Sequence, residues 1–186
     1  MTITTIVLII IALVVLWAIF AFNRFVSLKN RAKEAWADIA VQLKRRYDLI
    51  PNLVETVKGY AAHEKSAFEN VTKARAAAMG ASNIVDKGKA ENMLSSTLKS
   101  LFAVAEAYPE LKANQNFLSL QGELSDTENK IQAARRFYNT NVRDLNTSLQ
   151  TFPGNVVAGL FNFSAMEFFE LGAGEDAARN PVAVKF

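Results

Sequence analysis

The feature that most constrains this chain is an apolar run near its start. Residues 6–22 read IVLIIIALVVLWAIFAF and contain no charge, amide, glycine or proline. With the three residues before it, the run reaches the ~20 residues that an α-helix needs to cross a bilayer. In lipid, only a helix satisfies its own backbone hydrogen bonds as a single segment. The run therefore predicts a transmembrane helix, anchored by Ile6, Leu8, Leu13, Leu16, Trp17, Phe20 and Phe22.

Charges flank one end of this run only, and they predict its orientation. Basic side chains follow it closely, at Arg24, Lys29, Arg31 and Lys33, whereas no side chain before it is charged. Segments rich in lysine and arginine stay on the cytoplasmic side of a membrane. We therefore expect a single pass through a bacterial cytoplasmic membrane, with residues 1–5 outside and the domain after residue 22 in the cytoplasm. Each basic side chain could add about 1 kcal/mol of attraction to anionic lipid.

Three other interpretations fit the run less well. A cleaved signal peptide needs a positive start, a shorter core and small residues two apart before the cut, whereas Ala18 and Ala21 are three apart. A lipoprotein signal needs a cysteine, and the chain has none. A buried core helix is disfavoured by the length of the run and the basic residues behind it. We favour a permanent anchor.

Composition excludes several classes of function. The 186 residues include one histidine, His63, and no cysteine, which excludes disulfides, thiol nucleophiles and multi-histidine metal motifs. The 21 basic and 18 acidic side chains leave a net charge of +3, too balanced to indicate a nucleic-acid partner. His63 and Glu64 are the one place where acid–base chemistry could be argued, and we interpret them as surface residues. We predict no catalytic, metal or cofactor site.

Apolar periodicity after the run predicts an all-α fold. Apolar residues recur three and four positions apart, as on the buried face of a helix. We expect the transmembrane helix to continue into an antiparallel up-and-down bundle of three long helices and a short fourth (residues 23–165), followed by an irregular tail (166–186). The predicted helices run from Phe25 to Met79, from Asp86 or Lys89 to Tyr108, from Pro109 or Asn114 to Leu149, and from Val156 to Phe161.

The same periodicity predicts which side chains are buried. The apolar lanes of the first helix keep their phase except at Glu64, which falls inside one of them. The second and third helices each carry one apolar stripe. The predicted core residues are Trp36, Ala40, Leu43, Tyr47, Ile50, Val54, Val57, Ala61, Phe68, Val71 and Ala78, then Met93, Leu94, Leu98, Leu101, Phe102 and Ala105, then Phe117, Leu120, Leu124, Ile131, Ala134, Tyr138, Val142, Leu145 and Leu149.

Pro51 leaves two courses of the first helix open. Proline removes a helical hydrogen bond and disfavours helical geometry in the preceding residue, so a turn here would give two shorter helices. However, residues 48–53 contain no glycine and are mostly apolar, unlike a solvent-facing turn. The apolar lanes also keep their phase across the proline. We therefore favour one long helix that is kinked at Pro51.

The charged clusters and the phenylalanine-rich end have ordinary interpretations. Neighbouring basic residues on a helix point in different directions, so they do not form one basic stripe. We expect ion pairs with acids of other helices, or structural contacts around the Pro51 motif. We expect the acids of the third helix to be solvated. The C-terminal apolar residues either cap the bundle, which we favour, or dock on another subunit or on membrane. The basic residues are Lys44, Arg45, Arg46, Arg135, Arg136 and Arg143. The acids are Glu123, Asp126 and Glu128, and the C-terminal apolar residues are Val156, Val157, Leu160 and Phe161.

Several stretches of the chain resemble the LemA family. The most specific spans Arg46 to Glu55 and continues through Val57 to Ala61 and His63-Glu64. Others span Tyr108 to Asn114, Ala133 to Asn139, and Phe152-Pro153 followed by Ala158 to Phe161. The main motif contains Tyr47, Asp48, Leu49, Ile50, Pro51, Asn52, Leu53, Val54, Gly59 and Tyr60. The resemblance implies a single-pass membrane protein with a short outside N-terminus and an antiparallel bundle, usually of four helices. It supplies no catalytic residues. Some members occur beside a membrane-bound metalloprotease, and one branch is tied to magnetosome membranes.

Two functions fit these features. The first is a non-enzymatic scaffold or interaction module at the cytoplasmic face of the membrane, whose partners are the lipid bilayer and further copies of the chain in a homo-oligomer. The alternative is an accessory or adaptor of a membrane protease or an envelope-stress system, and it follows from the resemblance alone. An enzyme that uses His63 is disfavoured.

Overall fold

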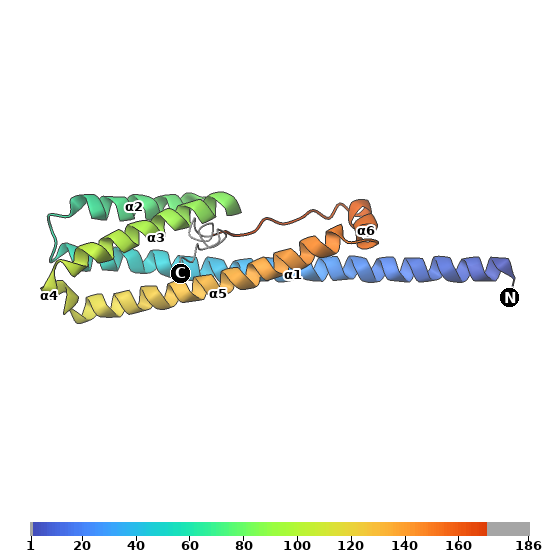
Figure 1. Cartoon of the computed structure of the whole chain (residues 1–186), viewed down its shortest axis with the longest axis horizontal. Coiled ribbons are helices and arrows are strands. Elements are labelled where there is room, and N and C mark those ends of the chain that lie inside the picture. The colour runs from blue at the N-terminus through green and yellow to red at the C-terminus, as the bar shows by residue number, and fades with distance from the viewer. Residues whose placement is uncertain (1, 171–186) are drawn as a thin grey trace, which may run out of the picture. The chain divides into compact units, whose positions relative to one another are not determined.

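The computed structural model describes residues 2–170, and these form helices joined by turns, without a strand. Figure 1 shows their course. The helices are α1 (Ile3–Lys58), α2 (Lys65–Gly80), α3 (Ile84–Glu106), α4 (Pro109–Lys112), α5 (Gln115–Gln150) and α6 (Gly154–Leu160). The predicted all-α class is confirmed. The chain divides into two compact units: unit 1 contains the residues up to Ile39 and Ala134–Glu167, and unit 2 contains Ala40–Ala133 and the described residues from Phe168 on.

α1 passes through Pro51 without interruption, so the prediction of a helix rather than a turn at the proline is confirmed. The predicted end of this helix at Met79 is wrong. α1 ends at Lys58, and α2 begins at Lys65 after a reversal that contains Gly59. Glycine is a poor helix former, and side-chain bonds from Tyr60 and Glu64 to residues 108–114 hold the reversal in place. The described residues therefore contain four long helices, because the first predicted helix is in fact divided into α1 and α2.

Unit 2 is built around the apolar stripes of its helices. α2 and α3 lie side by side (Figure 1), and Asn83 caps α3 by accepting a hydrogen bond from the backbone N–H of Asp86 at 2.7 Å. Most predicted core residues are buried. Four are only half-buried, namely Trp36, Phe102, Leu120 and Ala134, and two are exposed. Ala40 is exposed and Met93 is 61% exposed, because the buried lines of α1 and α3 pass through Ile39 and Leu94 instead.

The segment after α6 closes against α3 at Gly88. Phe169 is fully buried, and a Cβ at position 88 would collide with the carbonyl oxygen of Glu170. Glycine is therefore the residue that permits this close approach. The predicted irregular structure of the tail is seen from Phe163 to Glu170, and the rest of the tail lies outside the described residues.

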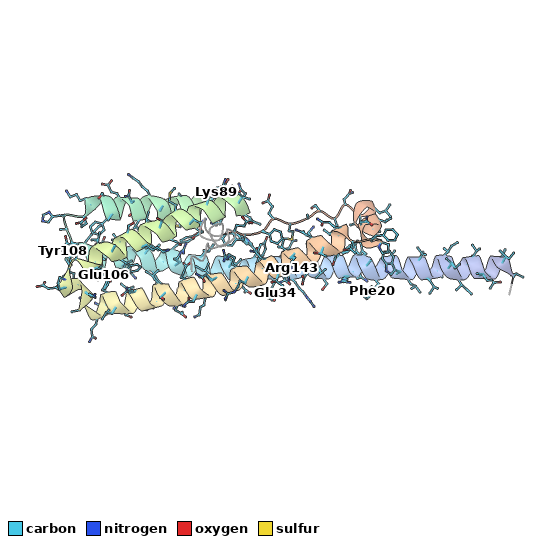
Figure 2. All side chains as sticks on the ribbon, viewed as in Figure 1. Phe20, Glu34, Lys89, Glu106, Tyr108 and Arg143 are labelled. Atoms are coloured by element: carbon cyan, nitrogen blue, oxygen red, sulfur yellow. The ribbon has the colours of Figure 1, made fainter. Side chains whose placement is uncertain are left out.

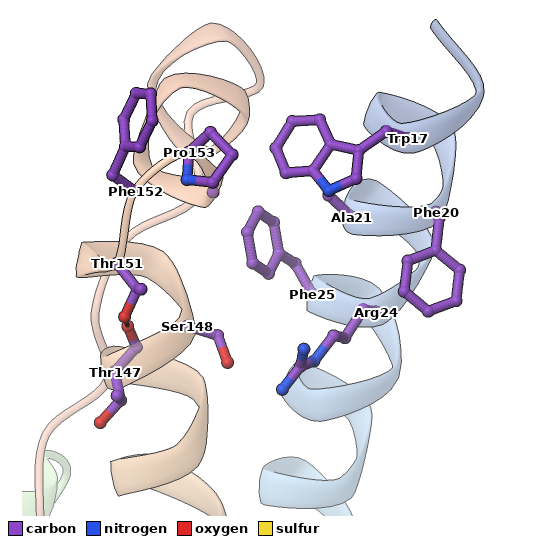
Figure 3. Close-up of a pocket in the computed structure, with 11 residues that line it drawn as sticks. Trp17, Phe20, Ala21, Arg24, Phe25, Thr147, Ser148, Thr151, Phe152 and Pro153 are labelled. Carbon is purple, nitrogen blue, oxygen red and sulfur yellow. Dashed lines mark hydrogen bonds between the residues drawn. The ribbon is translucent and has the colours of Figure 1, made fainter. Parts of the chain in front are cut away.

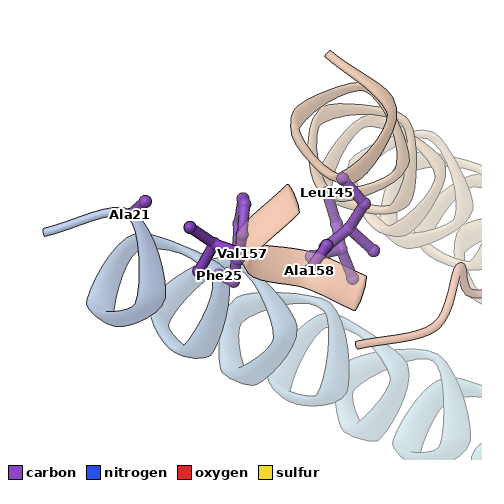
Figure 4. Packing of buried hydrophobic residues seen from close by; sticks show 6 residues of the cluster. Ala21, Phe25, Leu145, Val157 and Ala158 are labelled. Carbon is purple, nitrogen blue, oxygen red and sulfur yellow. The ribbon is translucent and has the colours of Figure 1, made fainter. Parts of the chain in front are cut away.

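Unit 1 joins the beginning of α1 to the end of α5 and to α6. Its core contains Ala21 and Phe25 from α1, Leu145 and Leu149 from α5, and Val157 and Ala158 from α6 (Figure 4). The chain after α6 is held to α5 by polar contacts. The amide side chain of Asn146 both accepts from the backbone N–H of Met166 and donates to its carbonyl, each at 2.9 Å. The hydroxyl of Tyr138 donates to the carbonyl of Glu167 at 2.8 Å.

Candidate functional site

The first turns of α1 expose a continuous apolar surface. α1 is the one helix of the described residues that is long and apolar enough to cross a membrane, and its side chains there stand clear of other elements (Figure 2). The predicted anchor residues Ile6, Leu8, Leu13, Leu16, Trp17 and Phe20 are all between 38% and 67% exposed. Phe22 differs. It is half-buried and packs edge-on against Phe161 and Phe163.

A cavity of about 290 Å³ lies in unit 1 where the apolar surface of α1 meets the first charge of the chain. Trp17 and Arg24 extend from α1 toward α5 and the start of α6 (Figure 3). The opposite wall carries the hydroxyls of Thr147, Ser148 and Thr151. The cavity thus has an apolar end and a polar, cationic end. Of the other predicted basic residues, Arg31 and Lys33 are exposed and Lys29 is half-buried.

The main sequence motif begins with a buried ion pair in unit 2. Arg46 is 2% exposed and Glu91, on α3, is fully buried. The Arg46 guanidinium donates to the Glu91 carboxylate, to the Glu128 carboxylate at 2.5 Å and to the Ser95 hydroxyl at 3.1 Å. The hydroxyl of Tyr47 donates to the other oxygen of Glu91. One charged cluster therefore ties α1 to both α3 and α5.

Pro51 has a specific role in this network. A residue with a backbone N–H at position 51 would donate it to the carbonyl of Tyr47, four residues earlier, but proline has none. The guanidinium Nε of Arg75, on α2, donates to that carbonyl at 2.8 Å. The proline thus frees an acceptor on α1, and the freed acceptor binds α2. This explains why the helix continues through a residue that weakens helices.

We predict that the effect of losing Arg75 depends on Pro51. Arg75→Met in the natural background should cost about 1–3 kcal/mol of unfolding free energy, because a buried carbonyl loses its partner. In a Pro51→Ala background the cost should be smaller, since the backbone N–H that this substitution restores can bond the Tyr47 carbonyl within the helix. A double-mutant cycle by chemical denaturation in detergent measures the difference. Equal costs in the two backgrounds would show that the proline does not supply the acceptor.

The phenol of Tyr47 is held in its protonated form. Burial, reinforced by the hydrogen bond to Glu91, raises the pKa of Tyr47 far above its ordinary value of 10.0. Burial, with the nearby Glu167 charge, also raises the pKa of Tyr138. While the unfolded chain also keeps its phenolic protons, these two tyrosines do not lower the free energy of unfolding. Once pH rises past the ordinary tyrosine pKa, the unfolded chain releases these protons and the folded chain loses stability relative to it.

We therefore predict that stability falls at alkaline pH through these two tyrosines. Between about pH 9 and about pH 11 the unfolded chain releases phenolic protons that the folded chain retains. The free energy of unfolding should decline with pH over this range, less steeply in Tyr47→Phe and less again in Tyr47→Phe/Tyr138→Phe. Denaturation midpoints measured at several pH values give the slopes. A slope that both substitutions leave unchanged would assign the effect to other groups.

Two further motif stretches meet at the end of unit 2. The Asn114 side chain donates to the Tyr60 hydroxyl at 2.9 Å, and it accepts from the Phe117 N–H at 3.0 Å, which caps α5. The Tyr108 hydroxyl reaches Glu64 at 3.5 Å. The reversal after α1 and the turn around α4 therefore hold each other. In the main motif, Ile50, Leu53 and Val54 are buried, Leu49 is half-buried, and Asp48, Pro51, Asn52, Gly59 and Tyr60 are exposed.

The predicted ion pairs between helices are confirmed for Arg45 and Arg46, whereas Lys44 pairs with Asp48 on α1 itself and Arg143 with Asp144 on α5 itself. Arg45 contacts Asp126 at 3.2 Å and Glu123 at 3.9 Å, and Arg46 contacts Glu91 and Glu128. Glu123 and Asp126 are about half-exposed, in line with solvated acids. Glu128 is a partner of the buried Arg46, so its prediction as an ordinary solvated acid is wrong.

Glu91 and Arg75 were not among the predicted site residues. Glu91 had a detectable signal, because it continues the buried line of Leu94, Leu98 and Leu101 at helical spacing. A charged residue in that position requires a buried partner. Arg75 had no signal, because its partner is a backbone atom. His63 is exposed, and the described residues contain no group of three or more metal-ligating side chains.

A groove of about 410 Å³ lies beside the ion pair in unit 2. Its walls come from α3 and α5, with Leu98 and Phe102 on one side and Leu124 and Gln132 on the other. Arg46 and Glu128 form part of its floor, so one face of the buried cluster reaches this groove. The groove combines apolar and polar lining, as small peptide or ligand sites do.

The sequence of this chain is similar to those of several known proteins. The sequence model of the LemA family matches residues 35–186. Magnetosome protein MamQ of Magnetospirillum gryphiswaldense is 23% identical over 86% of this chain and 69% of its own length. Magnetosome protein MamQ 2 of Paramagnetospirillum magneticum is 23% identical over 80% and 64%. Protein LemA of Metamycoplasma hominis is 28% identical over 80% and 70%. The chain thus spans about two thirds of the length of these relatives.

Proposed function

Because the chain belongs to the LemA family and carries a helix that can cross a bilayer, we propose that it is a non-enzymatic, single-pass membrane protein whose helical bundle is a scaffold or interaction module at the cytoplasmic face. The observation that carries this proposal is the composition of α1. One helix, Ile3–Lys58, contains the exposed apolar surface, the basic residues after it and the buried motif that assembles unit 2.

The contacts of the motif support a structural rather than a catalytic role. The polar side chains of Arg46 and Tyr47 are engaged by Glu91, Ser95 and Glu128. A catalytic group must be able to reach a substrate, whereas these groups bond to one another across three helices. The buried polar side chains of the motif therefore hold helices together, which suits a domain that presents surfaces to partners.

The basic residues after the apolar surface support the orientation. Arg24, Arg31 and Lys33 are exposed, and a positive segment at the end of a span stays on the cytoplasmic side. Because the chain has no cysteine, single cysteines can be placed at Thr2 and at Lys99, an exposed residue of α3. Each can then be labelled with a maleimide that does not cross membranes.

In intact cells whose outer barrier admits the reagent, Thr2→Cys should react and Lys99→Cys should react only after lysis. Both variants should react in detergent, which controls for accessibility within the fold. Reaction of Lys99→Cys in intact cells, with protection of Thr2→Cys, would reverse the proposed topology. Release of the protein from membranes by alkaline carbonate would contradict the anchor itself.

Self-association is the second part of the proposal. Phe137, on α5, is 56% exposed and Val41, on α1, is 63% exposed, so the domain offers apolar side chains to further copies. Amine-reactive crosslinking in native membranes should give dimers and larger species that persist when the expression level is lowered. Monomers alone at every expression level would remove self-assembly and leave the anchored interaction module.

A further inference from the structure

Unit 1 brings together two segments that contain no charged residue. α1 has no charged side chain before Arg24, and the chain has none between Asp144 and Glu167, a stretch that includes all of α6. The ends of these segments pack on each other, since Ala21 and Phe25 share a core with Val157 and Ala158. Apart from Arg24, which lines the neighbouring cavity, neither segment carries a charge where they meet.

α6 exposes apolar side chains on the face that it turns away from this core. Val157 and Ala158 are buried, whereas Val156 is 54% and Leu160 is 74% exposed. Residues four apart lie on the same face of a helix, so Val156 and Leu160 form one apolar face. Phe152, before α6, and Phe161, after it, are 78% and 55% exposed. Apart from Asn155, which is also exposed, the outer side of α6 is apolar, and such a surface favours an apolar medium.

The position of α6 along α1 indicates what that medium is. Phe161 lies with Val15, Ala18 and Ile19 along an open apolar groove of about 320 Å³, so α6 reaches the part of α1 that is predicted to lie in the bilayer. Phe152 and Pro153 line the same cavity as Trp17 and Arg24. Tryptophan and arginine at the end of a span mark the boundary between hydrocarbon and headgroups.

We propose that α6, with Phe152 and Phe161, is a second membrane contact that lies in the boundary between lipid headgroups and acyl chains beside the span. The inference rests on the proposed bilayer anchor. Lipid covers the exposed apolar face of α6, because this face is continuous with the lipid-facing surface of α1 and starts at the level of Trp17. Short apolar helices that lie flat at this depth bury their outer face in lipid. The domain is then attached to the membrane by two points of contact.

Spin labels on single cysteines can test this in the full chain. The variants Val156→Cys and Leu160→Cys would be labelled in nanodiscs of phosphatidylethanolamine and phosphatidylglycerol. Leu13→Cys is the lipid control, and Lys73→Cys, at an exposed position of α2, is the water control. Collision with oxygen reports lipid, and collision with a water-soluble nickel chelate reports water. All four side chains are exposed, so their replacement should not disturb the fold.

The oxygen-to-nickel collision ratio at Val156 and Leu160 should be several-fold higher than at Lys73 and should approach that at Leu13. A ratio at Leu160 equal to that at Lys73 would place α6 in water and overturn the inference while leaving the anchor intact. Low collision with both reagents would mean that protein, such as a second copy of the chain, covers this face, and it would also overturn the inference. A water-like ratio at Leu13 itself would overturn the anchor.

Discussion

Replacing Arg46 with methionine should lower the free energy of unfolding by about 3–5 kcal/mol, because it leaves a buried carboxylate without its partner. Glu91 is fully buried and Arg46 is its cationic neighbour. The Tyr47 hydroxyl would remain as a donor, but one neutral donor does not compensate a buried charge. Denaturant unfolding in detergent micelles, followed by circular dichroism, measures the loss.

The neighbouring arginine supplies the matched control. Arg45 is 40% exposed and pairs with Glu123 and Asp126 on the surface of α5, and exposed pairs contribute little. Arg45→Met should therefore change stability far less than Arg46→Met. The double variant Arg46→Met/Glu91→Leu should recover much of the loss, since it removes both charges. If Arg46→Met were no more destabilising than Arg45→Met, the buried pair would not be what joins α1 to α3.

Replacing Phe25 with alanine should cost about 3–5 kcal/mol, the usual range for a buried aromatic side chain. Phe25 is 2% exposed in the core that α1, α5 and α6 share. Its ring packs edge-on against Phe163 at 5.4 Å, and a Cβ at Gly154 would lie 3.3 Å from it. The cavity left by its removal would lie directly under α6, so α6 should detach first.

Hydrogen exchange and denaturant unfolding together test this prediction. Amides of α6 should exchange faster in Phe25→Ala than in the natural chain, whereas amides of α2 should be unaffected. Phe137→Ala removes an equally large ring that is 56% exposed, and it should leave both measurements nearly unchanged. Unaltered protection of α6 in Phe25→Ala would show that Phe25 does not hold α6 in place.

The parts of the fold that could be predicted from sequence are those that depend on periodicity. The apolar run of α1 and the stripes of α3 and α5 reflect the average burial of many residues, so one exception such as Met93 does not disturb them. The continuation of α1 through Pro51 could also be predicted, because the apolar lanes keep their phase across it. Long amphipathic helices are specified redundantly.

The features that could not be predicted depend on single contacts between distant segments. Periodicity continued past Lys58, and the reversal there is fixed by Asn114 bonding Tyr60 from 54 residues away. The burial of Arg46 requires Glu91, and the tolerance of Pro51 requires Arg75. In each case the partner lies in another segment of the chain. A helix stripe reports which face is buried but not which atoms meet there.

The predicted membrane span and the motif that assembles unit 2 belong to one uninterrupted helix, Ile3–Lys58. Hydrogen–deuterium exchange of the full chain in nanodiscs tests it most directly, because a helix protects each of its amides in turn. We expect slow exchange from the span through the junction at residues 22–30 and on to Lys58, followed by faster exchange at the exposed residues Ala62 and His63. Fast exchange at residues 22–30 would show a separate anchor joined to the bundle by a hinge, and would contradict the claim.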